Sequence, residues 1–128
     1  MTSELRVDNL KGSTTGGSIN VLGEGTSATT NLQQGLAKVW VRANDAASAS
    51  DSLNVSSTTD NDTGDYSYDF TNAMNSSDYC STATCVSTVP RIASVYGAST
   101  TQFEIRYHNE SGTDTNTANS NMVHGDLA

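Results

Sequence analysis

Apolar side chains recur at every second position in three separate stretches of this chain. Alternation by two places them on one face of a β-strand, and no window of eleven or more residues shows the 3.6-residue repeat of a helix. Turn-forming Asn, Asp, Gly and Ser separate the stretches at the spacing of a small sandwich. We therefore expect an all-β fold. The inward residues are Ala37, Val39, Val41 and Ala43; Tyr66, Tyr68 and Phe70; and Phe103, Ile105 and Tyr107.

Further strands and turns follow from the same patterns. On the first stretch, Leu36, Lys38, Trp40 and Arg42 are expected to face away from the small apolar residues. A hairpin is expected between 51–56 and 66–70, with Leu53 and Val55 on its inner face and 58–65 as its loop. Shorter strands are expected at 79–85, 92–96 and 122–125, and a long polar loop at 109–121. The stretch 43–50 suits a turn of helix or a loop.

The core must be thin, because nearly half of the 128 residues are Ser, Thr, Asn or Gly and only 34% are hydrophobic. Residues 1–34 contain two short apolar runs, 4–10 and 19–22, that cannot form a core alone. We expect 1–34 to form a short intertwined β shaft with two symmetry mates, and 35–128 to form an antiparallel β-sandwich head. The expected oligomer-interface residues are Leu5, Val7, Leu10, Ile19, Val21, Leu36 and Trp40; a sugar-stacking role is the alternative for Trp40.

Charge and hydropathy exclude two classes of partner. The formal net charge of −8 leaves no basic patch for nucleic acid. No run approaches the roughly 20 apolar residues of a membrane helix, so membrane insertion is not expected. The first four residues lack the basic and apolar regions of a signal peptide, and none is expected.

Three groups of residues resemble metal or redox sites. The run 60–65, Asp-Asn-Asp-Thr-Gly-Asp, suggests calcium, but Gly64 is fifth rather than sixth, which favours a hairpin turn. Cys80 and Cys85 lack the further ligands of a zinc site; a local disulfide and two free thiols are both open. His108 and His124 suit outer strand faces better than a metal on a three-fold axis. We expect no metal and no cofactor.

No catalytic motif is present, so the protein is expected not to be an enzyme. The rival class is a carbohydrate-active depolymerase that uses paired carboxylates. Glu104 and Asp69 are the nearest strand-borne candidates. Glu104 is expected instead to pair with Arg106 or Lys38.

Several runs resemble tail fibre proteins of marine and cyanobacterial bacteriophages. Residues 3–12, Ser-Glu-Leu-Arg-Val-Asp-Asn-Leu-Lys-Gly, with 16–21 after them, resemble the segment before the terminal domain of that family. The terminal domain itself is similar to 35–41, 51–57, 60–66 and 72–74, and the ending 124–128 is similar to the family's C-terminus. The resemblance implies a trimeric, non-enzymatic, β-structured virion protein that points toward the host surface.

That resemblance leaves two locations open, a tail appendage and a capsid fibre or decoration protein. In either case the protein would be synthesised in the host cytoplasm, bind other virion proteins through its N-terminal segment, and contact a host glycan or protein. Loops at 75–88, 96–102 and 110–121 are expected to bind this receptor, because polar loops on a rigid scaffold vary without disturbing the fold. The candidate receptor-binding residues are Tyr79, Tyr96, Glu110, Asp114 and Asn116.

Overall fold

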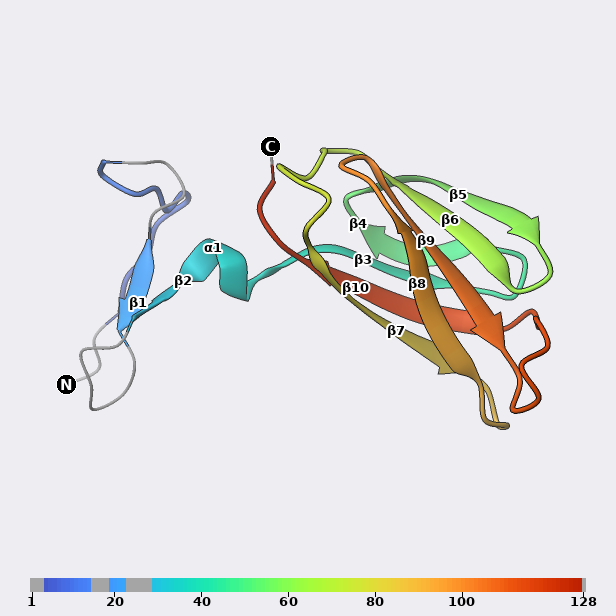
Figure 1. The fold of residues 1–128 in the computed structure, drawn as a ribbon. Helices are drawn as coiled ribbons and strands as arrows, with labels where there is room; N and C mark the ends of the chain where they lie inside the picture. Colours follow the sequence, from blue (N-terminus) through green and yellow to red (C-terminus); the bar gives the residue numbers. More distant parts are fainter. Residues whose placement is uncertain (1–3, 15–18, 23–28, 128) are drawn as a thin grey trace. The chain divides into compact units, whose positions relative to one another are not determined.

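The computed structural model describes residues 4–14, 19–22 and 29–127, and the chain divides into two compact units, 1–36 and 37–128 (Figure 1). No helix among the described residues is long and apolar enough to span a membrane.

The first unit contains a small hairpin and one turn of helix. Strands β1 (Asn20–Leu22) and β2 (Thr29–Asn31) pair antiparallel, and α1 (Leu32–Gly35) follows directly. The strand expected at 19–22 is therefore confirmed. Residues 4–14 contain no strand in the single chain. The strand expected at 4–10 needs symmetry mates to pair with, so it stays a prediction.

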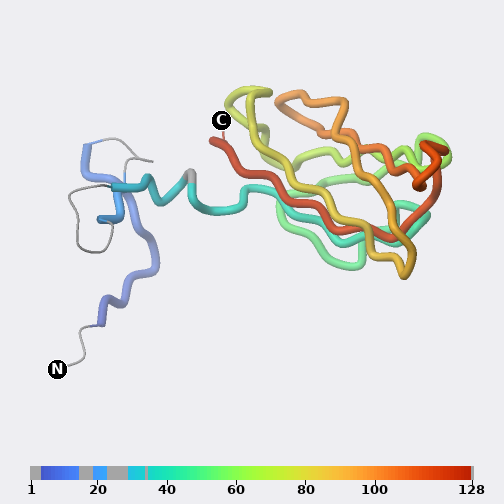
Figure 2. Tube along the Cα trace, turned by 60° about the horizontal axis from the view of Figure 1, so that its bottom comes forward, coloured from blue at the N-terminus to red at the C-terminus, as the bar shows by residue number. Residues whose placement is uncertain are grey.

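The second unit is an all-β sandwich of two four-stranded antiparallel sheets (Figures 1 and 2). Sheet I has the order β4 (Ala49–Leu53), β3 (Ala37–Ala43), β10 (Ala118–His124) and β7 (Cys80–Val86). Sheet II has the order β5 (Val55–Asp62), β6 (Asp65–Phe70), β9 (Gln102–His108) and β8 (Ile92–Ala98). This architecture confirms the expected all-β class.

Four connections meet at one end of the sandwich, which we call the loop end (Figure 1). They are residues 44–48, 63–64, 87–91 and 109–117. The antiparallel pairing places the start of β3 and residue 127 at the opposite end. The loop end is thus opposite the point where the chain enters the sandwich.

The core lies between the sheets, and it uses the alternating residues that the sequence indicates. All of the expected inward residues of β3, β6 and β9 are buried except Ala37, which is half-buried. The aromatic rings of sheet II pack on one another; the centroids of Tyr68 and Phe103 are 4.9 Å apart. Ala47, Met74 and Val123 complete the buried cluster.

Buried polar groups also cross the sandwich. The hydroxyl of Tyr68 donates to Asn119 Oδ1 at 2.7 Å, and that of Tyr107 donates to Asn121 Oδ1 at 2.8 Å. The hydroxyl of Tyr66 accepts from the backbone N–H of Thr117 at 3.2 Å. Each buried hydroxyl thus has a partner on the chain that leads into or forms β10.

The expected polar loop at 109–121 is therefore wrong in its second half. The loop ends at Thr117, and β10 begins at Ala118. Asn119 and Asn121 are buried although they are polar, because their oxygens accept from the tyrosine hydroxyls. Asn121 Nδ2 donates to Asn119 Oδ1, and Asn119 Nδ2 donates to the backbone oxygen of Thr117. Likewise, β7 occupies most of the expected loop at 75–88, and the strand expected at 79–85 is confirmed.

The expected hairpin is confirmed only in part: β5 pairs with β6, and Val55 lies opposite Phe70 and packs against the core. Asn54 has φ of 59° and divides the run, so that β4 pairs with β3 in sheet I while β5 pairs with β6 in sheet II. The hairpin turn is only Thr63 and Gly64, and the rest of the expected loop belongs to strands. Leu53 is consequently 46% exposed rather than inward.

Lys38 of β3, expected to face outward, is only 7% exposed.

Candidate functional site

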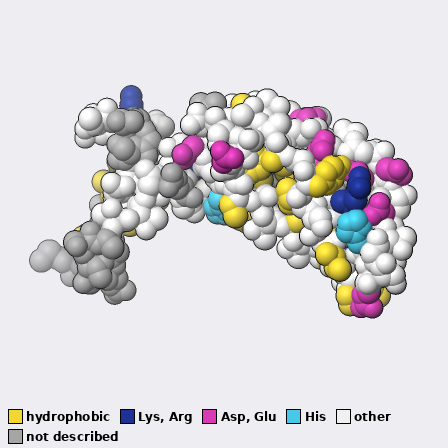
Figure 3. Space-filling view, in the orientation of Figure 1, with side chains coloured by type: hydrophobic (Ala, Val, Ile, Leu, Met, Phe, Trp, Pro, Cys, Tyr) yellow, Lys and Arg dark blue, Asp and Glu magenta, His cyan; other side chains and the backbone are white. Residues whose placement is uncertain are grey.

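A compact charged cluster lies on the neighbouring strands β6, β9 and β8 near the loop end, where Figure 3 shows acidic, basic and histidine side chains close together. Asp65 begins β6, and its side chain is only 8% exposed. Its carboxylate pairs with Arg106 of β9 and accepts from the hydroxyl of Tyr96 of β8 at 2.6 Å. Asn61 donates to the same carboxylate at 3.3 Å. The Arg106 guanidinium also lies over the Tyr96 ring, 4.9 Å from its centroid.

The electrostatics of this cluster keep each group in its ordinary charge state. Burial alone would raise the pKa of Asp65, but hydrogen bonds from Arg106, Tyr96 and Asn61 outweigh burial and lower it. Burial and the bond to the Asp65 carboxylate raise the pKa of Tyr96 to about 12. The bond to Asp65 raises the pKa of Arg106. All three shifts lead away from neutrality, so none prepares a general acid or base for neutral pH.

The loop 109–117 is held against this cluster. His108 Nδ1 lies 2.6 Å from Asp114 Oδ1, and Arg106 Nε lies 4.0 Å from Asp114 Oδ2. Asn116 Oδ1 accepts from the backbone N–H of Gly64 at 2.5 Å. Asn109 Oδ1 accepts from the N–H groups of Ser111 and Thr113 at 2.9 Å each. These bonds order a loop of otherwise small polar residues.

The candidate receptor-binding residues do not all come together. Tyr96, Asp114 and Asn116 lie at the loop end, where their side chains make the contacts just described. Glu110 is exposed there, beside a shallow hollow of about 400 Å³ between two loops. Tyr79 lies elsewhere, because its hydroxyl donates to the backbone of Gln102 at 2.8 Å. The hollow is lined by Val89, Pro90, Arg91, Asn109, Glu110 and Ser111.

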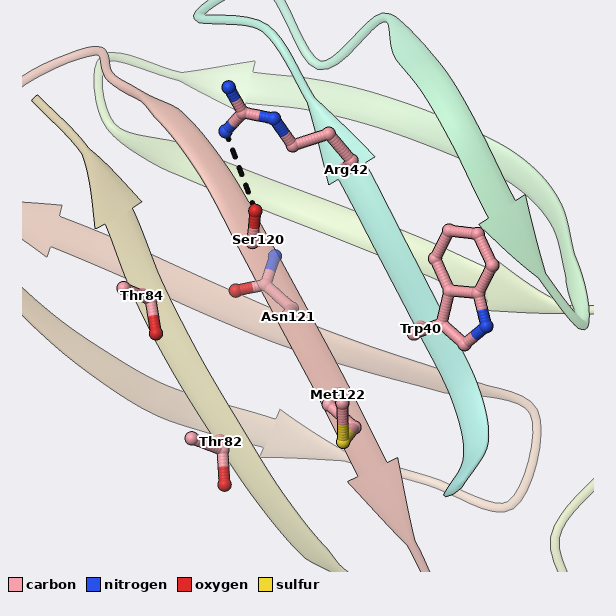
Figure 4. A pocket seen from close by; sticks show the side chains of 7 residues that line it. All are labelled: Trp40, Arg42, Thr82, Thr84, Ser120, Asn121 and Met122. Carbon is pink, nitrogen blue, oxygen red and sulfur yellow. Dashed lines mark hydrogen bonds between the residues drawn. The ribbon is translucent and has the colours of Figure 1, made fainter. Parts of the chain in front are cut away.

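A second candidate surface is the outer face of sheet I. A hollow of about 330 Å³ crosses β3, β10 and β7 there (Figure 4). In the strand register, Trp40 is opposite Met122, which is opposite Thr82. Arg42, Ser120 and Thr84 form the next row. This face combines one aromatic ring, one guanidinium and three hydroxyls.

The two cysteines cannot form the disulfide that the sequence left open. Cys80 is exposed on β7, whereas Cys85 is half-buried and its Sγ lies 4.0 Å from the backbone oxygen of Arg91. An odd separation of five places them on opposite faces of the strand, roughly 16 Å apart along it. A disulfide needs Cα atoms within about 7 Å. Both thiols are free.

The other candidates from the sequence are the run 60–65, the possible metal ligands and the carboxylates of Glu104 and Asp69. Gly64 has φ of 70°, as the turn interpretation of 60–65 predicts. Among the described residues, no group of three or more His, Cys, Asp or Glu is placed to hold a metal ion. Arg106 pairs with Asp65 and Asp114, and no ion pair joins it to Glu104 among the described residues. The alternative pairing of Glu104 with Lys38 stays a prediction. Asp69 accepts from the Ser57 hydroxyl at 2.5 Å.

In comparisons with known proteins, no family model matches the chain, and no curated protein or solved structure gives a match.

Proposed function

We propose that this protein is a non-enzymatic structural protein of a bacteriophage virion, a short tail-fibre or appendage unit that contacts the host surface as a homotrimer. The resemblance to phage tail fibres motivates the class. The binding role is inferred from the loop end, where hydrogen-bonded polar loops extend from the sandwich at the end opposite the start of β3. Such loops suit recognition because the scaffold fixes them while their tips stay accessible.

The N-terminal unit is the proposed attachment and trimerisation segment. Leu5, Val7, Leu10 and Val21 are all at least half exposed in the single chain. Ile19 is half-buried, and Leu36 is exposed. Exposed apolar residues at this density mark surfaces that another chain covers. Two symmetry mates and a neighbouring virion protein would supply that cover.

The proposed contact region is the hollow beside Glu110. Its walls offer a guanidinium from Arg91, the Glu110 carboxylate and the side chains of the 109–111 tip. These groups suit hydrogen bonds to a glycan or a polar protein surface. Single contacts of this kind are weak, so binding would depend on three copies in each trimer and several trimers in each particle.

The absence of catalysis is part of the proposal. The most enclosed carboxylate at the loop end, Asp65, is engaged by Arg106, Tyr96 and Asn61 and has a lowered pKa. A general acid of a glycosidase needs a raised pKa instead. The depolymerase alternative thus finds no support in this cluster.

A pair of matched charge reversals tests the binding role. Glu110→Arg changes the loop end, and Asp78→Arg makes the same change at an exposed position near the opposite end. We expect Glu110→Arg to lower adsorption of particles to host cells about tenfold or more, since multivalency amplifies each weakened contact. Asp78→Arg should leave adsorption unchanged. Equal adsorption of both variants and the wild type would favour the capsid-decoration alternative, provided that both variants unfold at the wild-type temperature.

A further inference from the structure

The outer face of sheet I carries a tryptophan beside an open hollow, away from the proposed contact region. Trp40 is the only tryptophan of the chain and is half-buried on this face. Met122 beside it is 41% exposed, and the hollow around them opens to solvent. A ring in this position offers an apolar platform to a ligand.

Arg42 supplies a positive charge next to that platform and forms no ion pair among the described residues. Its only side-chain contact among the described residues is one long hydrogen bond, from Nη1 to Ser120 Oγ at 3.4 Å. Asp51 is its cross-strand neighbour on β4, but the Asp51 carboxylate accepts from the Ser52 N–H at 2.9 Å and makes no ion pair with Arg42. Figure 4 shows the guanidinium reaching over β10, toward Ser120. Most of its five donors are therefore available to an anion.

Hydroxyl groups form the rest of the hollow. Thr82 and Thr84 are exposed on β7, and Ser120 lies between Thr84 and Arg42 in the register. Side chains on one face repeat about every 7 Å along a strand and about 5 Å across strands. Asn121 also borders the hollow, but its side chain is bonded to Tyr107 and Asn119 inside the sandwich.

We infer that this face binds an acidic saccharide, with a sugar ring stacked on Trp40, its carboxylate on Arg42 and its hydroxyl groups on Thr82, Thr84 and Ser120. A guanidinium matches a carboxylate in two parallel hydrogen bonds. An indole ring matches the C–H face of a pyranose, and small hydroxyls both donate and accept, as sugar hydroxyls do.

This chemistry fits a saccharide better than a second copy of the chain. A contact between two copies through this face would bury the Arg42 guanidinium, which costs desolvation free energy. It would also cover the hydroxyls of β7, which are not the apolar side chains of a subunit core. The inference departs from the expectation that Trp40 packs on a neighbouring subunit.

Trp40 makes the site directly measurable, because all tryptophan emission comes from it. We would titrate the full chain with tetragalacturonate and tetramannuronate, and with the methyl-esterified form of each, which has the same skeleton without the charge. A saturable change in emission is expected with at least one acid, and its methyl ester should bind at least about tenfold more weakly, as loss of one charge-assisted contact implies.

Two arginine variants complete the experiment. Arg42→Gln should abolish the preference for the acid over its ester, whereas Arg6→Gln, an exposed arginine paired with Glu4 in the other unit, should retain it. Matched thermal unfolding verifies that both variants are folded.

Three results would overturn the inference. They are no saturable change with either acid, equal acid preference in Arg42→Gln and Arg6→Gln, or a Trp40→Leu variant that dissociates an oligomer of the wild-type chain. The titration uses the isolated protein and the adsorption assay uses Glu110→Arg particles. The saccharide site and the proposed function can therefore fail separately.

Discussion

At the scale of single residues, Asp65 illustrates what a sequence can and cannot indicate. In the sequence it is the last residue of a turn-like run, and the turn was predictable from Asn, Asp and Gly. Its partner Arg106 is 41 residues away, and only the pairing of β6 with β9 brings the two together. Local patterns carry no information on such a pair, so the charged cluster could not be predicted.

Asp65→Asn is expected to lower the free energy of unfolding at pH 7 by about 1–3 kcal/mol. The reason is that an uncharged amide replaces the nearly buried carboxylate that pairs with Arg106. In the wild-type protein, folding lowers the pKa of Asp65 below its ordinary value of 3.8. The Asp65 carboxylate therefore stabilises the fold fully above pH 3.8, and this stabilisation is lost as the pH falls through the folded-state pKa. Urea unfolding at pH 7 and in acid should show a weaker pH dependence for the variant. Equal pH dependence in both proteins would contradict this role.

Asn119 is expected to be a second sensitive position. Asn119→Ala leaves the buried Tyr68 hydroxyl and the Asn121 amide without their shared acceptor. We expect a loss of about 2 kcal/mol or more in the free energy of unfolding, and about 1 kcal/mol for Tyr68→Phe, which removes only one partner. Chemical denaturation measures both. If the two losses were equal, the amide of Asn121 would not depend on Asn119.

At the scale of elements, strand positions were predictable but several strand partners were not. Alternation indicated β3, β6 and β9 because one face of each is apolar. It missed the start of β10, where Asn119 and Asn121 occupy core positions through hydrogen bonds to tyrosines. It also missed the division at Asn54, since a single left-handed residue sends β4 and β5 to different sheets.

The β5–β6 turn gives a matched test of backbone geometry. Gly64 and Gly112 have similar φ angles, 70° and 76°. A Cβ at Gly64 would lie 2.6 Å from the backbone oxygen of Tyr107, whereas at Gly112 nothing lies within 4 Å. Gly112→Ala should therefore cost about 1 kcal/mol, the conformational penalty alone, and Gly64→Ala clearly more. Equal losses in thermal unfolding would show that the backbone at Tyr107 and Thr115 moves away without cost.

At the scale of the whole molecule, the sequence indicated a polar chain with a thin core and an N-terminal segment that is not self-sufficient. Composition supports such statements because apolar area limits what a chain can bury. In the second unit, hydrogen bonds from tyrosine hydroxyls of sheet II to asparagines of sheet I fill part of the interior with polar groups. Assembly is a property of several chains, so the trimer stays a prediction.

Removing residues 1–36 is expected to separate folding from assembly. The second unit has its own buried cluster, so 37–128 should unfold cooperatively near the wild-type temperature. The full chain should be a trimer and the truncated chain a monomer, because the exposed apolar residues of the first unit are the proposed contact. Light scattering at micromolar concentration measures both. A well-folded monomer of the full chain would contradict the proposed trimer.

We propose that this protein is a three-fold appendage on the host-facing part of a virion. Electron cryo-microscopy of particles that carry the protein would locate it. We expect three-fold density on the tail that fits three sandwiches, with residues 63–64 and 109–117 of each pointing away from the particle. Density on the capsid surface instead of the tail would contradict this proposal.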